Sequence, residues 1–188
     1  MIKEFFNKIE LHEAIYKNSI KNKYFEQKLI SLSLAIKDTI KNKGKIIFAG
    51  NGGSFADSLH ISAEFTGKFK KQRDPYPSIV LGANFSYTTA VANDYGYQNI
   101  FLREFNSLAN KNDLLICLTT SAKSNNIYDL VQLSKKKNIK YFVITGSNNG
   151  LFVNNENLLN IDSYDTDVIQ EITIMILHSA VDYLEKNI

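Results

Sequence analysis

Short runs of almost unbroken apolar residues are the feature that most constrains the fold of this 188-residue chain. Four of them are clear, and a weaker fifth follows; they lie at residues 45–49, 78–81, 113–118, 141–146 and 157–161. Amphipathic segments with helical spacing separate the runs. Strands that are apolar on both sides and alternate with helices are typical of a parallel sheet with both faces covered. The sequence therefore predicts an α/β fold, a doubly wound αβα sandwich.

The same spacing predicts helices before, between and after the strands. Apolar residues recur at helical intervals from Ile2 to about Asn42, which indicates a hairpin of two helices with a break near Asn18. We expect these N-terminal helices either to pack against another subunit or to cover the core of their own chain. Further helices are expected at 55–65, 86–92, 99–109, from 124 to about 137, and 165–186. No linker or repeat divides the chain, so residues 1–188 are expected to form one domain.

Composition excludes several classes of protein. Cys117 is the only cysteine, so no internal disulfide can form and no oxidising compartment is needed. The net charge of +3 is small and only Arg73 and Arg103 are arginines, which argues against nucleic-acid binding. No run approaches the ~20 apolar residues of a membrane span, and the charged N-terminus does not resemble a signal peptide. We therefore expect a cytoplasmic protein with no membrane or nucleic-acid partner.

Two polar loops follow predicted strands and each opens a helix. The first reads GNGGS at 50–54, and the second reads TTSAKS at 119–124. Glycines let the backbone approach a ligand closely, and a helix N-terminus offers unpaired N–H groups to an anion. The hydroxyls and amides of the second loop suit a phosphate. Neither loop has the spacing of a nucleotide-hydrolysing P-loop or of a dinucleotide-binding turn. The pair therefore predicts a site for a phosphorylated small molecule.

Four polar residues near these loops are candidates for chemistry. His60 and Glu64 share one face of the helix after the first loop, and Gln170 and His178 lie in the last helix. A histidine on an apolar helix is often a structural core residue, and His60 with Glu64 can be a simple surface pair. Together with a phosphate site, however, the four can move protons between carbons or hold a divalent metal. Angular spacing alone pairs His178 with Glu171, about 20° away, rather than with Gln170, about 80° away.

With these residues in place, the chain resembles the phosphoheptose isomerases of the sugar isomerase (SIS) superfamily along nearly its whole length. The shared motifs are AGNGGS at 49–54, His60-x-x-x-Glu64-x-Thr66-Gly67, AxANDYGY at 90–97, TTSxxS at 119–124, ITG at 144–146, and IQE from 169 followed by His178. Several separated motifs that follow one another in the same order argue against a chance match.

The resemblance implies a five-stranded parallel sheet and a homotetramer with active sites shared between subunits. It implies an aldose–ketose isomerase that converts sedoheptulose 7-phosphate to D-glycero-D-manno-heptose 7-phosphate through an enediol, for the heptose of bacterial lipopolysaccharide or capsule. Glu64 is expected to be the catalytic base and His178 to move protons on the oxygens. The substrate-binding positions that it implies are Asn51, Gly52, Gly53, Ser54, Glu64, Asn93, Asp94, Thr119, Thr120, Ser121, Ser124 and Gln170. One zinc ion per subunit is expected on His60, Glu64, Gln170 and His178.

The sequence departs from the family pattern at a few positions. The second loop commonly reads STSGNS, so Ala122 stands where glycine is usual and Lys123 adds a charge, while Lys68 replaces an arginine. Alanine takes a positive φ less readily than glycine. Two alternatives stay open: a non-catalytic SIS domain that senses sugar phosphates or regulates replication initiation, and an isomerase of another sugar phosphate. The presence of Glu64 and His178 favours the heptose isomerase.

Overall fold

The computed structural model describes residues 2–188 apart from the side chain of residue 5, and contains the expected parallel sheet. Its strands are β1 (Ile46–Gly50), β2 (Ser78–Val80), β3 (Leu114–Leu118), β4 (Lys140–Thr145) and β5 (Leu158–Asn160). All neighbouring strands are parallel and follow the order β2-β1-β3-β4-β5. The prediction of five parallel strands is confirmed, including the weak fifth run.

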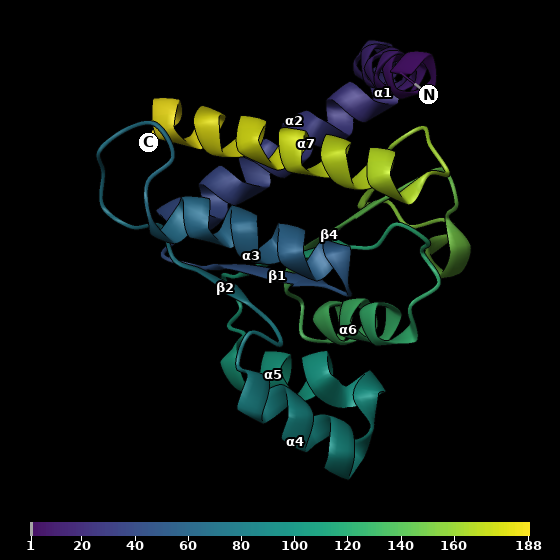
Figure 1. Cartoon of the computed structure of the whole chain (residues 1–188). Helices are drawn as coiled ribbons and strands as arrows, with labels where there is room; N and C mark the ends of the chain where they lie inside the picture. Colours follow the sequence, from purple (N-terminus) through teal and green to yellow (C-terminus); the bar gives the residue numbers. More distant parts are fainter. Residues whose placement is uncertain (1) are drawn as a thin grey trace.

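Helices cover both faces of the sheet (Figure 1). They are α1 (Ile2–Lys21), α2 (Lys23–Lys41), α3 (Gly53–Thr66), α4 (Phe85–Tyr95), α5 (Ile100–Leu108), α6 (Asn125–Lys136) and α7 (Thr166–Asn187). Alternate residues of β1 point to opposite layers: Ile46 and Phe48 join the core under α2, α3 and α7, whereas Ile47 and Ala49 join the core under α4, α5 and α6. Both sides of each strand are thus buried, which is why the strands read as unbroken apolar runs.

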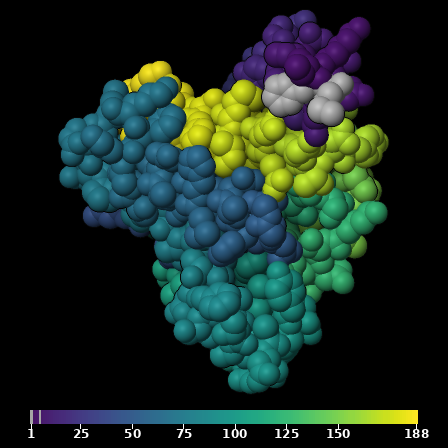
Figure 2. Space-filling model, in the orientation of Figure 1, coloured from purple at the N-terminus to yellow at the C-terminus, as the bar shows by residue number. Residues whose placement is uncertain are grey.

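The N-terminal helices differ in detail from the expectation. The break falls at Asn22 rather than near Asn18, and the Asn22 side chain caps α2 by accepting bonds from the amides of Tyr24 and Phe25. A single linking residue is shorter than the two to five residues that an antiparallel helical hairpin takes. The two helices therefore meet at a bend, and the expected hairpin is an angled pair. Most of α1 is exposed, and it projects from one end of the molecule while the α4 segment projects from the other (Figure 2).

The strand order fixes where a ligand can bind. From β1 the chain crosses to β2 on one side, then returns to β3 on the other side of β1. Such a switch point opens a crevice beyond the carboxyl ends of the two strands. Gly50 at the end of β1 is paired with Leu118 at the end of β3, so the two polar loops start at the same level. None of the helices described between residues 2 and 188 is long and apolar enough to span a membrane.

Candidate active site

The first loop is built around close backbone contacts. Gly52 has a φ of +55°, in the left-handed region that glycine adopts at little cost. At Gly53, an added β-carbon would lie 2.1 Å from Nε2 of Gln170, so a side chain there would collide with α7. The two positions therefore favour glycine for different reasons. Gly52 allows the left-handed turn, and Gly53 leaves room for the Gln170 amide. This loop brings the start of α3 and the start of α7 together.

Asparagine side chains join the two loops across the crevice. Asn51 and Asn126 exchange amide hydrogen bonds of 2.9 and 3.0 Å, which ties the end of β1 to the first turn of α6. The hydroxyl of Tyr97 donates to Oδ1 of Asn51 at 2.8 Å, so the turn after α4 also contacts this loop. Asn93 and Asp94 lie exposed near the end of α4, where Asn93 donates to Asp94. Loops after two strands and one helix thus converge at the switch point.

The second loop keeps a left-handed residue without a glycine. Ala122 has a φ of +55° and is fully buried in the core under α6, and its carbonyl accepts a hydrogen bond from the amide of Leu151. Ala122, at the position of the family's glycine, therefore has a positive φ. Thr119 is buried, whereas Ser121 is exposed and Ser124 is the N-cap residue of α6 with no side-chain capping bond. Ser54, in contrast, is buried in the first turn of α3.

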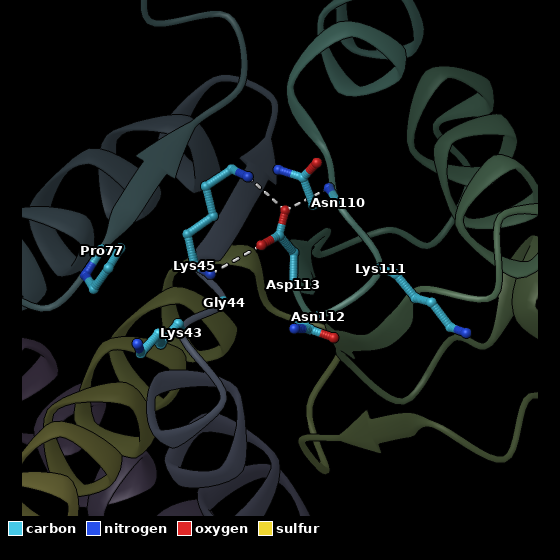
Figure 3. Close-up of a pocket in the computed structure, with 8 residues that line it drawn as sticks. All are labelled: Lys43, Gly44, Lys45, Pro77, Asn110, Lys111, Asn112 and Asp113. Carbon is cyan, nitrogen blue, oxygen red and sulfur yellow. Dashed lines mark hydrogen bonds and ion pairs between the residues drawn. The ribbon is translucent and has the colours of Figure 1, made fainter.

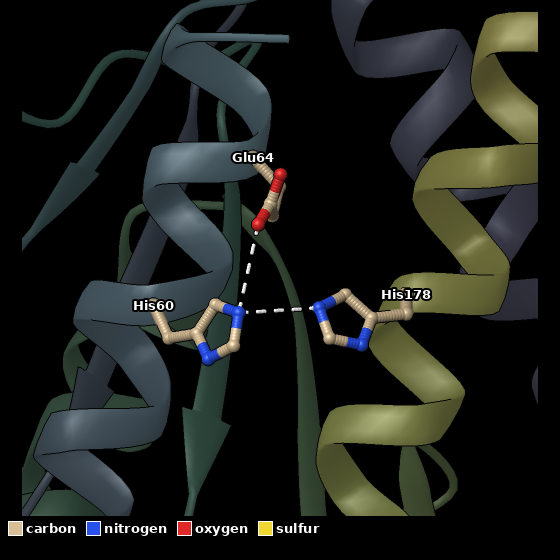
Figure 4. A group of neighbouring side chains, drawn as sticks. All are labelled: His60, Glu64 and His178. Atoms are coloured by element: carbon tan, nitrogen blue, oxygen red, sulfur yellow. Dashed lines mark hydrogen bonds and ion pairs between the residues drawn. The ribbon is translucent and has the colours of Figure 1, made fainter. Parts of the chain in front are cut away.

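A cluster of two imidazoles and one carboxylate lies between α3 and α7 (Figure 4). Nε2 of His60 is 3.3 Å from Nε2 of His178 and 3.5 Å from Oε1 of Glu64. Burial lowers the pKa of His178, the positive charges of His60 and Lys70 lower it further, and Glu64 partly opposes them. His178 is therefore held neutral near pH 7, in the state that binds a metal or accepts a proton.

Gln170 and Glu171 do not join this cluster within the chain. Eight residues separate Gln170 from His178, about 12 Å along a helix, and the Gln170 amide lies against Gly53. Glu171, the partner of His178 suggested by angular spacing, bonds to Nδ1 of His12 at 2.5 Å instead. Glu171 and His178 line the same surface hollow, but Glu171 pairs with His12 of α1 and not with His178, so that suggestion is wrong. The structure thus assembles three of the four expected metal ligands.

Asp57 is a candidate that the sequence analysis did not identify. Its Oδ2 atom is buried without a hydrogen-bond partner among the described residues. Burial raises the pKa of Asp57, and the nearby His60 opposes part of that rise. Asp57 precedes His60 by one helical turn, so both lie on one side of α3. That spacing was the available signal for a carboxylate near His60.

A second polar hollow lies at the opposite edge of the sheet, at the amino ends of β1 and β3 (Figure 3). It encloses about 390 Å³. Asp113 is 3% exposed there and accepts hydrogen bonds from the amide and the ammonium of Lys45 and from the amide of Asn110. Both oxygens of the Asp113 carboxylate are therefore bonded to neighbouring groups of the fold. The bonds of Asp113 therefore fix the amino ends of β1 and β3. The candidate active site consists of the two polar loops at the carboxyl ends of the strands and of the cluster of His60, Glu64 and His178 farther along α3.

Comparison with known proteins identifies the family of the chain. Residues 13–146 match the model of the SIS domain family. The phosphoheptose isomerase of Campylobacter concisus is 36% identical over 96% of this chain and 94% of its own length. Structures of phosphoheptose isomerases from Francisella tularensis and Neisseria gonorrhoeae superimpose with TM-scores of 0.92 and 0.90, at 26% and 25% identity, over 99% of this chain and 98% and 100% of theirs. The chain therefore belongs to the SIS domain family and, within it, to the phosphoheptose isomerases.

Proposed function

We propose that this protein is an aldose–ketose isomerase that converts sedoheptulose 7-phosphate to D-glycero-D-manno-heptose 7-phosphate. The observation that carries the proposal is the cluster of His60, Glu64 and His178 on the two helices that meet at the glycine loop. A carboxylate beside two imidazoles supplies the proton transfers of an enediol reaction. The polar loops supply phosphate donors, and the first of them starts α3 about 10 Å before His60 along the helix. The product serves as a precursor of the heptose in lipopolysaccharide or capsule.

Each residue of the site has a distinct role in this proposal. Glu64 removes the proton from the carbon beside the carbonyl and returns it to the neighbouring carbon. His178, held neutral by burial, moves protons on and off the substrate oxygens. His60 positions both. The loops at Asn51 to Ser54 and Thr119 to Ser124, with Asn93, Asp94 and Gln170, hold the phosphate and hydroxyls of the sugar.

The three-residue cluster also fits zinc. Ligands bound at 2.0–2.1 Å in a tetrahedron lie about 3.3–3.4 Å from each other. Two separations, 3.3 Å between the histidine nitrogens and 3.5 Å from His60 to Glu64, are close to that spacing, and all three ligand atoms lie within 4.8 Å of one another. The three ligands of one chain leave a fourth position for Gln170 of a second copy, and zinc can take a fifth ligand from the substrate in the transition state. A zinc ion held there would polarise the carbonyl and stabilise the developing negative charge.

The assembly proposed is a homotetramer with shared sites, working in the cytoplasm. Its support is the apolar surface of α1, where Ile2 and Ile9 are 76% and 50% exposed. Within one chain Gln170 lies far from the cluster along α7, so it completes the zinc site only from a second copy. The single, buried Cys117 is compatible with a reducing compartment.

The function is tested by NMR of the purified protein with sedoheptulose 7-phosphate, with and without a chelator. We expect signals of the manno-configured aldoheptose 7-phosphate to appear and to stop growing when metal is removed. Turnover of a pentose or hexose phosphate but not of the heptulose would assign another isomerase. Binding of these sugar phosphates without turnover of any of them would assign a sensor.

A further inference from the structure

A buried carboxylate near the end of α7 holds the segment that follows α3. The side chain of Glu185 is 1% exposed. It accepts hydrogen bonds from the amides of Phe69, Lys70 and Lys71 at 3.1, 2.9 and 3.0 Å. Its fourth bond, of 2.8 Å, comes from Nε of Arg73. Burial alone would raise the pKa of Glu185, but these four bonds outweigh it and hold the pKa below its ordinary value.

Arg73 continues the connection to the end of α3. Its guanidinium donates to the carbonyls of Glu64 and Phe65 at 2.7 and 3.0 Å, and it also reaches those of Gly67 and Asp74. The last carbonyls of a helix lack partners within the helix, so Arg73 caps α3. Its flat face lies 3.9 Å from the ring of Tyr76. One side chain therefore bonds the backbone of Glu64, the proposed base, and the carboxylate of Glu185.

Residues 67–73, here named the strap, are fixed by these bonds against one face of α7. His178, Asp182 and Glu185 lie on that face, four and seven residues apart. Lys70 of the strap pairs with Asp182 at 3.0 Å. The ring of Phe69 stacks on His178 with centroids 5.2 Å apart and an interplanar angle of 10°. The Nε2 edge of the His178 ring points at His60, whose ring centroid lies 5.0 Å away at an interplanar angle of 66°.

The Phe69 ring of the strap affects the orientation of the His178 imidazole. The torsion that rotates an imidazole has broad minima, so a half-buried histidine takes its orientation from what packs against it. Phe69 packs on one face of the His178 ring and His60 lies at its Nε2 edge, so Nε2 of His178 is held toward His60. An imidazole turned away from that direction could neither bind a shared metal nor exchange a proton with substrate.

We propose that Glu185 and Arg73 are positioning residues of the active site, which hold the strap so that Phe69 fixes the ring of His178. Arg73 reaches the cluster only through the backbone carbonyl of Glu64, and the bonds described for Glu185 all go to the strap. The proposal rests on the proposed function, because Glu185 and Arg73 affect catalysis only if His178 takes part in the reaction. Residues that orient the ligands of a site without binding there themselves commonly contribute about 10–100-fold to activity or metal affinity. We expect Glu185→Gln to lower kcat at least about tenfold with little change in KM.

The test uses a spectroscopic reporter and a matched control. The chain has no tryptophan, so Phe69→Trp installs a single fluorescent probe on the strap. Adding Glu185→Gln or Arg73→Lys to this reporter should shift its emission to the red and lower its anisotropy as the strap detaches. Asp113→Asn removes the charge of an equally buried carboxylate at the far edge of the sheet (Figure 3). That control should cost stability but leave the emission and kcat unchanged.

Phe69 itself keeps the proposal testable if the Glu185 variant does not fold. Phe69→Tyr preserves a stacking ring and should retain most of kcat, whereas Phe69→Leu should lose about tenfold. Full kcat in Phe69→Leu, or unchanged reporter emission in a folded Glu185→Gln protein, would overturn the positioning role. An equal loss of kcat in Asp113→Asn would do the same. If the wild type turns over no sugar phosphate, the proposed function fails while the emission still reports whether the pair holds the strap.

Discussion

At the scale of single residues, Glu64 carries the strongest prediction. Glu64→Gln keeps the size of the side chain but removes the base, so we expect kcat to fall by about 10²–10⁴-fold while thermal unfolding stays unchanged. The side chain is 24% exposed and makes no buried ion pair that folding depends on. Steady-state kinetics and the unfolding midpoint measure both effects. A variant that keeps more than a tenth of wild-type kcat would exclude Glu64 as the base.

Glu171→Gln is the matched control for that experiment. It makes the same chemical change on α7, at the carboxylate that pairs with His12 and is 60% exposed. We expect its kcat to match the wild type, because the carboxylate faces α1. Loss of turnover in this control alone would restore the partner that angular spacing suggested for His178.

The histidines allow a second prediction, about metal. His60→Ala and His178→Ala should each weaken zinc binding by at least about 100-fold, since losing even an outer partner costs about 10–100-fold. His12→Ala removes the third histidine of the chain and should leave zinc binding unchanged. Metal content after dialysis against a competing chelator measures the affinity without relying on activity. Equal zinc retention in all three variants would show that the cluster is a metal-free hydrogen-bonded group.

Single residues also mark the limit of what sequence reveals about this site. The spacing of His60 and Glu64 was enough to place them together. Angles around a helix axis did not show that Gln170 and His178 lie about 12 Å apart along it. Asp57 was missed because the burial of its oxygen depends on neighbouring elements, which no local pattern encodes. The Phe69 contact with His178 was likewise hidden, since the strap has no regular period.

At the scale of elements, the second loop has a role that can be separated from chemistry. Ser121→Ala removes an exposed hydroxyl beside the start of α6, so we expect KM for the phosphorylated sugar to rise with kcat nearly unchanged. Sedoheptulose without its phosphate should be a poor substrate for the wild type. Comparable kcat/KM for the free and the phosphorylated sugar would contradict phosphate binding by residues 119–124.

The end of α2 offers a prediction about stability. Lys43 follows the C-cap Asn42 with a φ of +57°, a position where helices usually have glycine. Lys43→Gly relieves that backbone strain, and we expect the free energy of unfolding to rise by up to about 1 kcal/mol. Lys41→Gly, inside the last turn, should lower it by about the same amount. Urea unfolding separates the two, and a less stable Lys43→Gly protein would refute the argument.

The elements themselves could largely be predicted, and the exceptions have physical reasons. Strands buried on both faces are apolar at nearly every position, so the bounds of β1, β3 and β4 could be predicted to within a residue or two. The bend at Asn22 was expected near Asn18, because both asparagines are plausible caps and only packing of Phe25 against the core distinguishes them. The left-handed Ala122 could not be foreseen, since its carbonyl bond to Leu151 comes from a distant loop.

At the scale of the whole molecule, α1 is notable because most of its residues are exposed. It contacts α7 through ion pairs of Lys8 with Asp167 and of His12 with Glu171. Its apolar residues lie mainly on the surface, with Ile2, Phe6 and Ile9 between 50% and 76% exposed. These three recur at intervals of four and three residues and form one stripe along the helix. An apolar stripe of this kind is typical of a surface that a partner subunit covers.

The stripe gives the last prediction, which concerns assembly. The wild type should sediment as a tetramer, and the double variant Phe6→Ser with Ile9→Ser should sediment as smaller species, because each change removes apolar area that the interface would bury. The control variant Lys3→Ser with Glu10→Ser introduces two serines beside the stripe instead of in it, and should leave the tetramer intact. If Gln170 of a second copy completes the zinc site, as proposed, the dissociated variant should also lose zinc affinity. A monomeric wild type, or a double variant that stays tetrameric, would show that α1 does not form the interface.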